Sequence, residues 1–263
     1  MLSALLTLLG LVGGSFVGVV SARGPVRWGL IEGDSRSFVT GRSACDACGR
    51  RLGPLDLVPV LSFLVLRGRC RSCGARIPRR DLVIEMLGGA AGLIAALAFL
   101  PSVGTALAAL VFLLSVLGAA AVDAETGYLP DALTGAATWT ALVASALGIG
   151  GAPPAAAVLG AAVGYLALRL VADGYAVLRG REGLGLGDAK LLAAGGAWLG
   201  PLALPFVVLA AALAGLVAVA LRPGRLDADA SLRFGPYLAA GIALMAVIVA
   251  VLPGRIVPAW PLP

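Results

Sequence analysis

Residues 103–123 read VGTALAALVFLLSVLGAAAVD, an uncharged apolar run that ends in the carboxylate of Asp123. A helix needs about 20 such residues to cross a bilayer core of roughly 30 Å. The run therefore predicts a transmembrane helix. Its last residue places an ionisable group at the end of that helix, where a charge is costly enough to indicate function.

Runs of this kind recur along the chain, which has 263 residues, 60% of them hydrophobic and 13% charged. The mean hydropathy is +0.99, too apolar for a soluble domain of this length. We therefore expect an all-α polytopic membrane protein with about eight transmembrane helices. They are predicted near residues 2–22, 82–100, 103–123, 132–150, 153–178, 188–200, 202–221 and 235–253.

Three regions follow from this pattern: a first transmembrane helix over residues 1–22, a polar module over 23–81, and a helical membrane core over 82–263. The first helix lacks the basic start and the small-residue cleavage site of a signal peptide, so we expect it to be retained.

The basic residues predict how the chain is oriented. Of the 20 Lys and Arg residues, 12 lie between Arg23 and Arg80, and cytoplasmic segments carry the excess of such residues. We therefore expect the polar module in the cytoplasm and the N-terminus outside. The other arginines expected in cytoplasmic loops are Arg179, Arg181, Arg222, Arg225 and Arg233. The net charge of +6 then reflects topology, and we expect anionic membrane lipids as partners rather than nucleic acid.

All four cysteines lie in the polar module, as the pairs Cys45/Cys48 and Cys70/Cys73. Two C-x2-C pairs are typical of a tetrahedral Zn²⁺ site, and four cysteine ligands leave no open position for catalysis. We therefore expect a structural zinc ion. Free thiols or two disulfides are the alternative, although disulfides require an oxidising compartment.

Acid–base chemistry in this chain must use side chains other than histidine, because the sequence contains none. The sharpest candidates are Asp123, at the end of one apolar run, and Asp188, at the start of another. The expected topology brings both to the cytoplasmic membrane face. Two neighbouring carboxylates cannot both ionise cheaply, so such a pair shares a proton and can activate water for peptide hydrolysis.

The two aspartates also predict unequal roles. Asp188 lies at the N-terminus of its predicted helix, where the helix dipole favours a negative charge, so our hypothesis makes it the ionised member. Gly185 and Gly187 precede it and leave room for an extended peptide backbone. An aspartate at a helix start is also a common N-cap, and carboxylates in helical bundles also bind transported ions, so composition alone leaves these alternatives open.

The same residues resemble the bacterial type IV prepilin peptidases, also called prepilin leader peptidases and N-methyltransferases. The likeness covers nearly the whole chain in five places. The matching stretches are Gly14-Ser15-Phe16 with Arg23, the run from Val58 to Cys70 between the cysteine pairs, Asp123 with Leu129-Pro130-Asp131, Gly185-Leu186-Gly187-Asp188-Ala189-Lys190, and Phe234-Gly235-Pro236-Tyr237. Ile77, Arg80 and Glu85 also fit the family pattern.

This resemblance implies an aspartic endopeptidase of the bacterial inner membrane, with Asp123 and Asp188 as its catalytic pair. The implied substrates are prepilins and pseudopilins of type IV pilus and protein secretion systems, whose leader peptides are removed on the cytoplasmic side. It also implies S-adenosylmethionine-dependent N-methylation of the new N-terminus. Gly18, Asp46 and Asp81 depart from the family pattern in the part associated with methylation.

Three charged residues are candidates for a supporting role. Asp131 and Lys190 lie close in sequence to the catalytic pair and could tune its proton affinity, and Glu85 belongs to the matched pattern. Capping or lipid headgroup pairing explains them equally well. Two other functions stay open: a carboxylate-dependent transporter, and a non-catalytic anchoring protein of a secretion system. The oligomeric state has no signature in the sequence.

Overall fold

The computed structural model describes residues 1–32, 41–180, 185–221 and 233–252. Every long element in these residues is a helix, and the only β pairings there are two isolated bridges. The predicted all-α class is confirmed. The chain divides into two compact units, Met1–Leu97 and Ala98–Pro263. The three regions expected from the sequence remain a proposal.

The first unit contains the helices α1 (Leu2–Arg27), η1 (Pro54–Leu57), α2 (Leu61–Val65) and α3 (Arg79–Phe99). Helices α1 and α3 meet through glycines. A Cβ atom on Gly10 would lie 2.3 Å from the carbonyl oxygen of Gly88, and one on Gly92 would lie 2.2 Å from that of Leu6. The two backbones therefore touch, as is typical of membrane helices with small residues at their interface.

Helix α1 continues five residues past its predicted end at residue 22. The extension is ordered by packing that the hydropathy pattern does not reveal: Ser21, Gly24 and Pro25 are buried, and the ring of Trp28 lies against Gly24.

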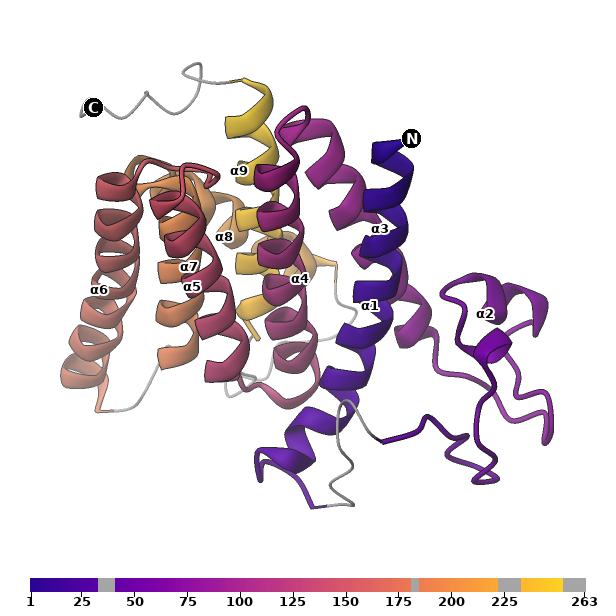
Figure 1. The fold of residues 1–263 in the computed structure, drawn as a ribbon. Coiled ribbons are helices and arrows are strands. Elements are labelled where there is room, and N and C mark those ends of the chain that lie inside the picture. The colour runs from indigo at the N-terminus through magenta and orange to yellow at the C-terminus, as the bar shows by residue number, and fades with distance from the viewer. Residues whose placement is uncertain (33–40, 181–184, 222–232, 253–263) are drawn as a thin grey trace. The chain divides into compact units, whose positions relative to one another are not determined.

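The second unit is a bundle of six helices (Figure 1). They are α4 (Val103–Thr126), α5 (Asp131–Ala146), α6 (Pro154–Arg179), α7 (Leu186–Leu199), α8 (Leu204–Ala220) and α9 (Gly235–Val251), with a short η2 (Pro201–Ala203) before α8. Helix α9 packs against α4, α7 and α8, and α7 also packs against α5 and α6. Helix α9 therefore contacts both helices that carry the predicted catalytic aspartates.

Helix α7 is enclosed by its neighbours, because all its residues from Asp188 to Leu199 except Lys190 are buried. It approaches α6 at Gly160 and Gly196, where a Cβ atom on either glycine would lie 2.1 Å from the carbonyl oxygen of the other. At its other end, the ring of Trp198 stacks on Phe112 of α4 at a centroid distance of 4.9 Å. A helix that is apolar on all sides is stable only in such a position.

All eight helices predicted from apolar runs are present. In the part of the chain that the structure describes, five segments are long and apolar enough to cross a membrane: α1, α3, α4, α6, and η2 with α8. Helices α5, α7 and α9 have 16, 14 and 17 residues. The chain is therefore a multi-pass membrane protein, and a total of eight crossings stays a prediction. Arg181, Arg222 and Arg225, which we expected in cytoplasmic loops, lie outside the described residues.

The contact between α6 and α7 predicts that adding one methyl group at Gly196 destabilises the fold. Gly196→Ala should lower the stability of the folded protein by roughly 1–3 kcal/mol or more, because the added Cβ atom cannot fit against Gly160. Thermal unfolding of the detergent-solubilised protein measures the change. Gly174→Ala on α6 is the matched control, since a Cβ atom there meets nothing within 4 Å. Equal stability of the two variants would contradict this packing.

Candidate functional site

Asp123 lies in the last turn of α4, which ends where Gly127 adopts the left-handed conformation at a φ of 70° and donates its N–H to the Asp123 carbonyl. The side chain of Asp123 is only 5% exposed. Its Oδ2 atom accepts a hydrogen bond of 3.1 Å from the backbone N–H of Gly235 at the start of α9. This carboxylate is therefore held by a helix that begins 112 residues later in the chain.

Asp188 lies in the first turn of α7, behind the N-cap residue Gly185, and is 7% exposed. Its Oδ1 atom is buried and has no hydrogen-bond partner among the described residues. The carboxyl group of Asp123 lies close enough for its charge to act on that of Asp188. The structure thus brings together the two aspartates that the sequence singled out, from helices that both pack against α5 and α9 and that also meet where Trp198 stacks on Phe112.

Asp131 and Lys190 also meet in the structure, as an ion pair of 2.5 Å between the first residue of α5 and the second turn of α7. The pair is partly exposed, with 67% of the Asp131 side chain and 38% of the Lys190 side chain accessible. Exposed pairs stabilise a fold by only about 0–1 kcal/mol. The ion pair links the N-terminus of α5 to α7 at a position two residues after Asp188.

The two glycines before Asp188 have different surroundings. Gly187 packs against Leu129, since a Cβ atom there would lie 2.5 Å from the Leu129 Cβ. Gly185 is exposed, and the nearest atom to a Cβ there is Oδ2 of Asp188 at 3.8 Å. Gly187 therefore allows α7 to approach the connection between α4 and α5, whereas Gly185 is exposed and a Cβ atom there would make only ordinary contact with Asp188.

Two residues that contact this site were not among the candidates named from the sequence. Gly235 donates to Asp123, and Arg233 donates a hydrogen bond to the carbonyl oxygen of Ala124, one residue after Asp123. Both belong to the stretch around Phe234-Gly235-Pro236-Tyr237, which the sequence marked as a motif without a role. A glycine and a proline at the start of an apolar run were the available signal.

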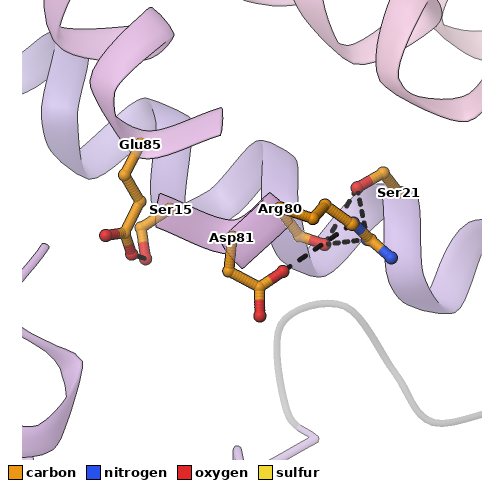
Figure 2. Close-up of polar contacts among 6 residues, drawn as sticks. Ser15, Ser21, Arg80, Asp81 and Glu85 are labelled. Atoms are coloured by element: carbon orange, nitrogen blue, oxygen red, sulfur yellow. Dashed lines mark hydrogen bonds and ion pairs between the residues drawn. The ribbon is translucent and has the colours of Figure 1, made fainter. Parts of the chain in front are cut away.

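Glu85 belongs to the first unit, as does the cysteine segment. Figure 2 shows the Glu85 side chain beside Ser15. Its carboxylate accepts a 2.9 Å hydrogen bond from the Ser15 hydroxyl of α1 and a 2.7 Å bond from the backbone N–H of Val60. Val60 has a φ of 62°, a conformation that β-branched residues rarely adopt. Glu85 therefore joins α1 and α3 to a turn in the segment between the cysteine pairs, and it supports the module's structure.

A second polar contact joins the same two helices. Arg80 of α3 donates a 2.9 Å hydrogen bond to the hydroxyl of Ser21, which is fully buried, and forms an ion pair of 3.7 Å with Asp81 (Figure 2). Buried hydroxyls are normally satisfied in this way. Polar contacts thus hold α1 to α3 at the end where the cysteine module begins.

The two cysteine pairs form nearly identical turns. Cys45 accepts from the N–H of Gly49 and donates to Arg50, and Cys70 accepts from the N–H of Gly74 and donates to Ala75. An isolated β-bridge closes each turn, between Ala44 and Arg51 in one and between Arg69 and Arg76 in the other. Both glycines are left-handed, with φ values of 71° and 70°. This is the backbone that a C-x2-C zinc ligand pair requires.

The four sulfur atoms fit a zinc ion. They lie within 4.8 Å of one another, and the Sγ atoms of Cys45 and Cys73 are 3.8 Å apart. Tetrahedral zinc with bonds of about 2.3 Å separates its sulfur ligands by about 3.8 Å. The cluster can hold a metal ion, and its four ligands fit a structural zinc.

The fold and these two sites define a multi-pass helical membrane protein that carries a cysteine metal site and a pair of buried, interacting aspartates. Two family models match the chain: the bacterial peptidase A24 N-terminal domain over residues 8–99 and the type IV leader peptidase family over residues 107–220. No solved structure matches.

Curated relatives match along most of their length. A prepilin leader peptidase/N-methyltransferase of Burkholderia pseudomallei is 43% identical over 252 residues, covering 89% of this chain and 81% of the relative. One of Dickeya chrysanthemi is 41% identical over 260 residues, covering 92% and 91%, and one of Neisseria gonorrhoeae is 36% identical over 254 residues, covering 89% and 86%. The chain belongs to the type IV leader peptidase family.

The metal site predicts about one zinc ion per chain in the purified protein. Cys48→Ser or Cys73→Ser should remove most of it, because three thiolates with a hydroxyl bind zinc far more weakly than four thiolates. Elemental analysis of the purified protein measures the metal content. Ser43→Ala, in the first turn but with no ligand atom, is the matched control and should retain its zinc. Equal metal content in all variants would show that these sulfurs hold no zinc.

Proposed function

We propose that this chain is a membrane endopeptidase that removes the leader peptide from type IV prepilins and pseudopilins, with Asp123 and Asp188 as its catalytic pair. The observation that carries the proposal is that two buried aspartates lie on separate helices, α4 and α7, which both pack against α5 and α9. The substrate class comes from the names of the relatives and of the matching family.

Hydrolysis by such a pair requires one carboxylate and one carboxylic acid. The carboxylate takes a proton from a water molecule as the water oxygen attacks the scissile carbonyl carbon, and the carboxylic acid donates its proton to the carbonyl oxygen. The tetrahedral intermediate then collapses. The peptide nitrogen takes the proton that the first carboxylate gained from water and leaves as an amine. A hydroxyl of the intermediate gives its proton to the second carboxylate as the new carboxyl group forms, so both aspartates return to their starting protonation.

The surroundings of the pair suit this reaction. Gly185 is exposed beside Asp188 and carries no side chain, so an extended peptide could approach the carboxyl group there. The buried Oδ1 atom of Asp188 has no partner among the described residues, so it is available to a substrate carbonyl or to water. The ion pair of Lys190 with Asp131 joins α7, two residues after Asp188, to the start of α5.

We place both aspartates and the cysteine module on the cytoplasmic side of the bacterial inner membrane. The support for this orientation is the concentration of basic residues between Arg23 and Arg80. On that side, the pair would meet a prepilin where its basic leader ends and its apolar helix enters the membrane.

We also propose that the chain methylates the new N-terminus, as the second activity named for its relatives. The methyl donor would be S-adenosylmethionine. The described residues contain no strand followed by a glycine-rich loop, which is how soluble methyltransferases hold this cofactor, so we derive no step through it. Both proposed catalytic aspartates belong to the second unit, which leaves the first unit as the part to test for methyl transfer.

The peptidase proposal predicts that Asp123→Asn and Asp188→Asn each lower prepilin cleavage by at least 10²–10⁴-fold, roughly the contribution of one general acid or base. Membranes containing each variant are mixed with a prepilin, and the shortened product is followed by gel mobility. Asp173→Asn on α6, an exposed aspartate paired with Arg169, is the matched control and should cleave normally. Cleavage retained in either dyad variant at normal protein levels would restore the transporter and anchoring alternatives.

The methylation proposal predicts that Asp188→Asn still transfers a labelled methyl group to a pilin supplied with its mature N-terminus. The expectation follows because no peptide bond remains to be cleaved in that substrate. Incorporation of label into the pilin is the readout, with an uncleaved prepilin as the negative control. If the wild-type protein cleaves prepilin but transfers no label, the methylation proposal is wrong and the peptidase proposal is unaffected.

A further inference from the structure

The two aspartates differ in what surrounds their carboxyl oxygens. Oδ2 of Asp123 accepts a hydrogen bond from the Gly235 N–H, whereas Oδ1 of Asp188 is buried without a donor among the described residues. A hydrogen-bond donor from the backbone favours a carboxylate over a carboxylic acid. A buried oxygen without a donor favours the protonated form, since an unpaired buried charge is far more costly than a neutral group.

The donor to Asp123 belongs to the N-terminus of α9, a helix of 17 residues. The first N–H groups of a helix have no partner within it, and the helix dipole makes this end positive. Pro236 has no N–H, and the N–H groups of Tyr237 and Leu238 both donate to the carbonyl of Phe234. The N–H of Gly235 is thus the donor that remains for Asp123.

Gly235 must be a glycine for this contact to exist. A Cβ atom at this position would lie 2.7 Å from Oδ2 and 3.0 Å from Cγ of Asp123. The first contact is closer than real Cβ atoms make and the second is unusually tight, so a side chain would push the carboxylate away from the backbone donor.

Arg233 adds a positive charge at the same place. Its guanidinium donates to the Ala124 carbonyl, near Gly127, and its charge acts on the Asp123 carboxylate. The hydrogen bond alone would be an ordinary cap of the C-terminus of α4. A helix cap needs only the hydrogen bond to the carbonyl, so the effect of the Arg233 charge on Asp123 is an additional role of this residue.

We propose that the N-terminus of α9 is the third component of this site, in which Gly235 and Arg233 hold Asp123 as the carboxylate and leave Asp188 as the acid. Asp123 then takes the proton from the attacking water, and Asp188 donates its proton to the scissile carbonyl oxygen. Gly235 and Arg233 are positioning residues, because they act through Asp123. This inference rests on the proposed peptidase function, and it reverses the sequence-based hypothesis that Asp188 is the ionised member.

The pH dependence of cleavage tests the role of Arg233. The titratable and charged side chains on α4, α5, α7 and the start of α9 around Asp123 are Glu125, Asp131, Asp188, Lys190, Arg233 and Tyr237. Only Arg233 is changed. Removing its positive charge makes the carboxylate form of Asp123 harder to reach, so the acid limb of the pH–activity profile should move to higher pH by up to about one unit in Arg233→Gln.

Two variants separate charge from capping. Glutamine can still donate to the Ala124 carbonyl, so a role limited to the cap predicts an unchanged profile for Arg233→Gln. Arg233→Lys retains the charge and should restore the wild-type acid limb. Arg179→Gln, an exposed arginine at the end of α6, is the control and should not shift the profile. A profile of Arg233→Gln that superimposes on the wild type would overturn the role of Arg233.

Gly235→Ala tests the backbone donor. It should lower kcat by tenfold or more with little change in KM, because substrate contacts remain while the carboxylate is displaced. Gly174→Ala is the matched control in open space. A kcat equal to that of the wild type in Gly235→Ala would show that the Gly235 N–H does not position Asp123.

A labelling experiment needs no variant. An epoxide esterifies an ionised carboxylate, so in the wild-type protein it should modify Asp123, as mapped by mass spectrometry. Modification of Asp188 instead would overturn the assignment while leaving the peptidase function intact. The peptidase function itself fails only if Asp123→Asn or Asp188→Asn still cleaves, so the two failures are distinguishable.

Discussion

The second unit depends on the backbone contact between α6 and α7 at Gly160 and Gly196. Lipid gives no hydrophobic drive for helices to associate, so membrane helices are held by close packing and by internal hydrogen bonds. With no side chain on either glycine, α7 reaches the interior of the bundle, where it packs against α5, α6 and α9. Asp188 enters that interior on α7, and Asp123 reaches it at the end of α4. The buried position of the two carboxylates is therefore a consequence of where glycines interrupt the apolar sequence.

Much of this arrangement can be predicted from the sequence because hydropathy is local. Each apolar run became a helix, and the two C-x2-C pairs became two equivalent turns with their sulfurs together. Asp123 and Asp188 were recognisable because a carboxylate at the end of an apolar run is costly without a purpose. The resemblance to a peptidase family indicated that these two aspartates act as a pair. Family models and relatives support that resemblance.

Contacts across the bundle could not be predicted in this way. The dipole argument for Asp188 considered only its own helix, whereas the donor to Asp123 comes from Gly235, which is distant in sequence. Glu85 appeared as a member of a pattern, but its partners Ser15 and Val60 come from different elements. The left-handed backbone of Val60 has no sequence signature at all, because valine disfavours it and only the surrounding contacts stabilise it.

The lengths of the helices around the aspartates have a consequence for the surrounding lipid. At 1.5 Å per residue, the 14 residues of α7 extend about 21 Å and the 16 residues of α5 about 24 Å, less than the roughly 30 Å of a bilayer core. Because α7 is enclosed by its neighbours, the mismatch acts at α5, whose Trp139 and Val143 are exposed. It thins the bilayer locally and draws polar headgroups and water toward this side of the bundle. Water, the second reactant of hydrolysis, would then reach Asp188 although the residue lies in an apolar bundle. The rate of the reaction would accordingly respond to the acyl chain length of the host membrane.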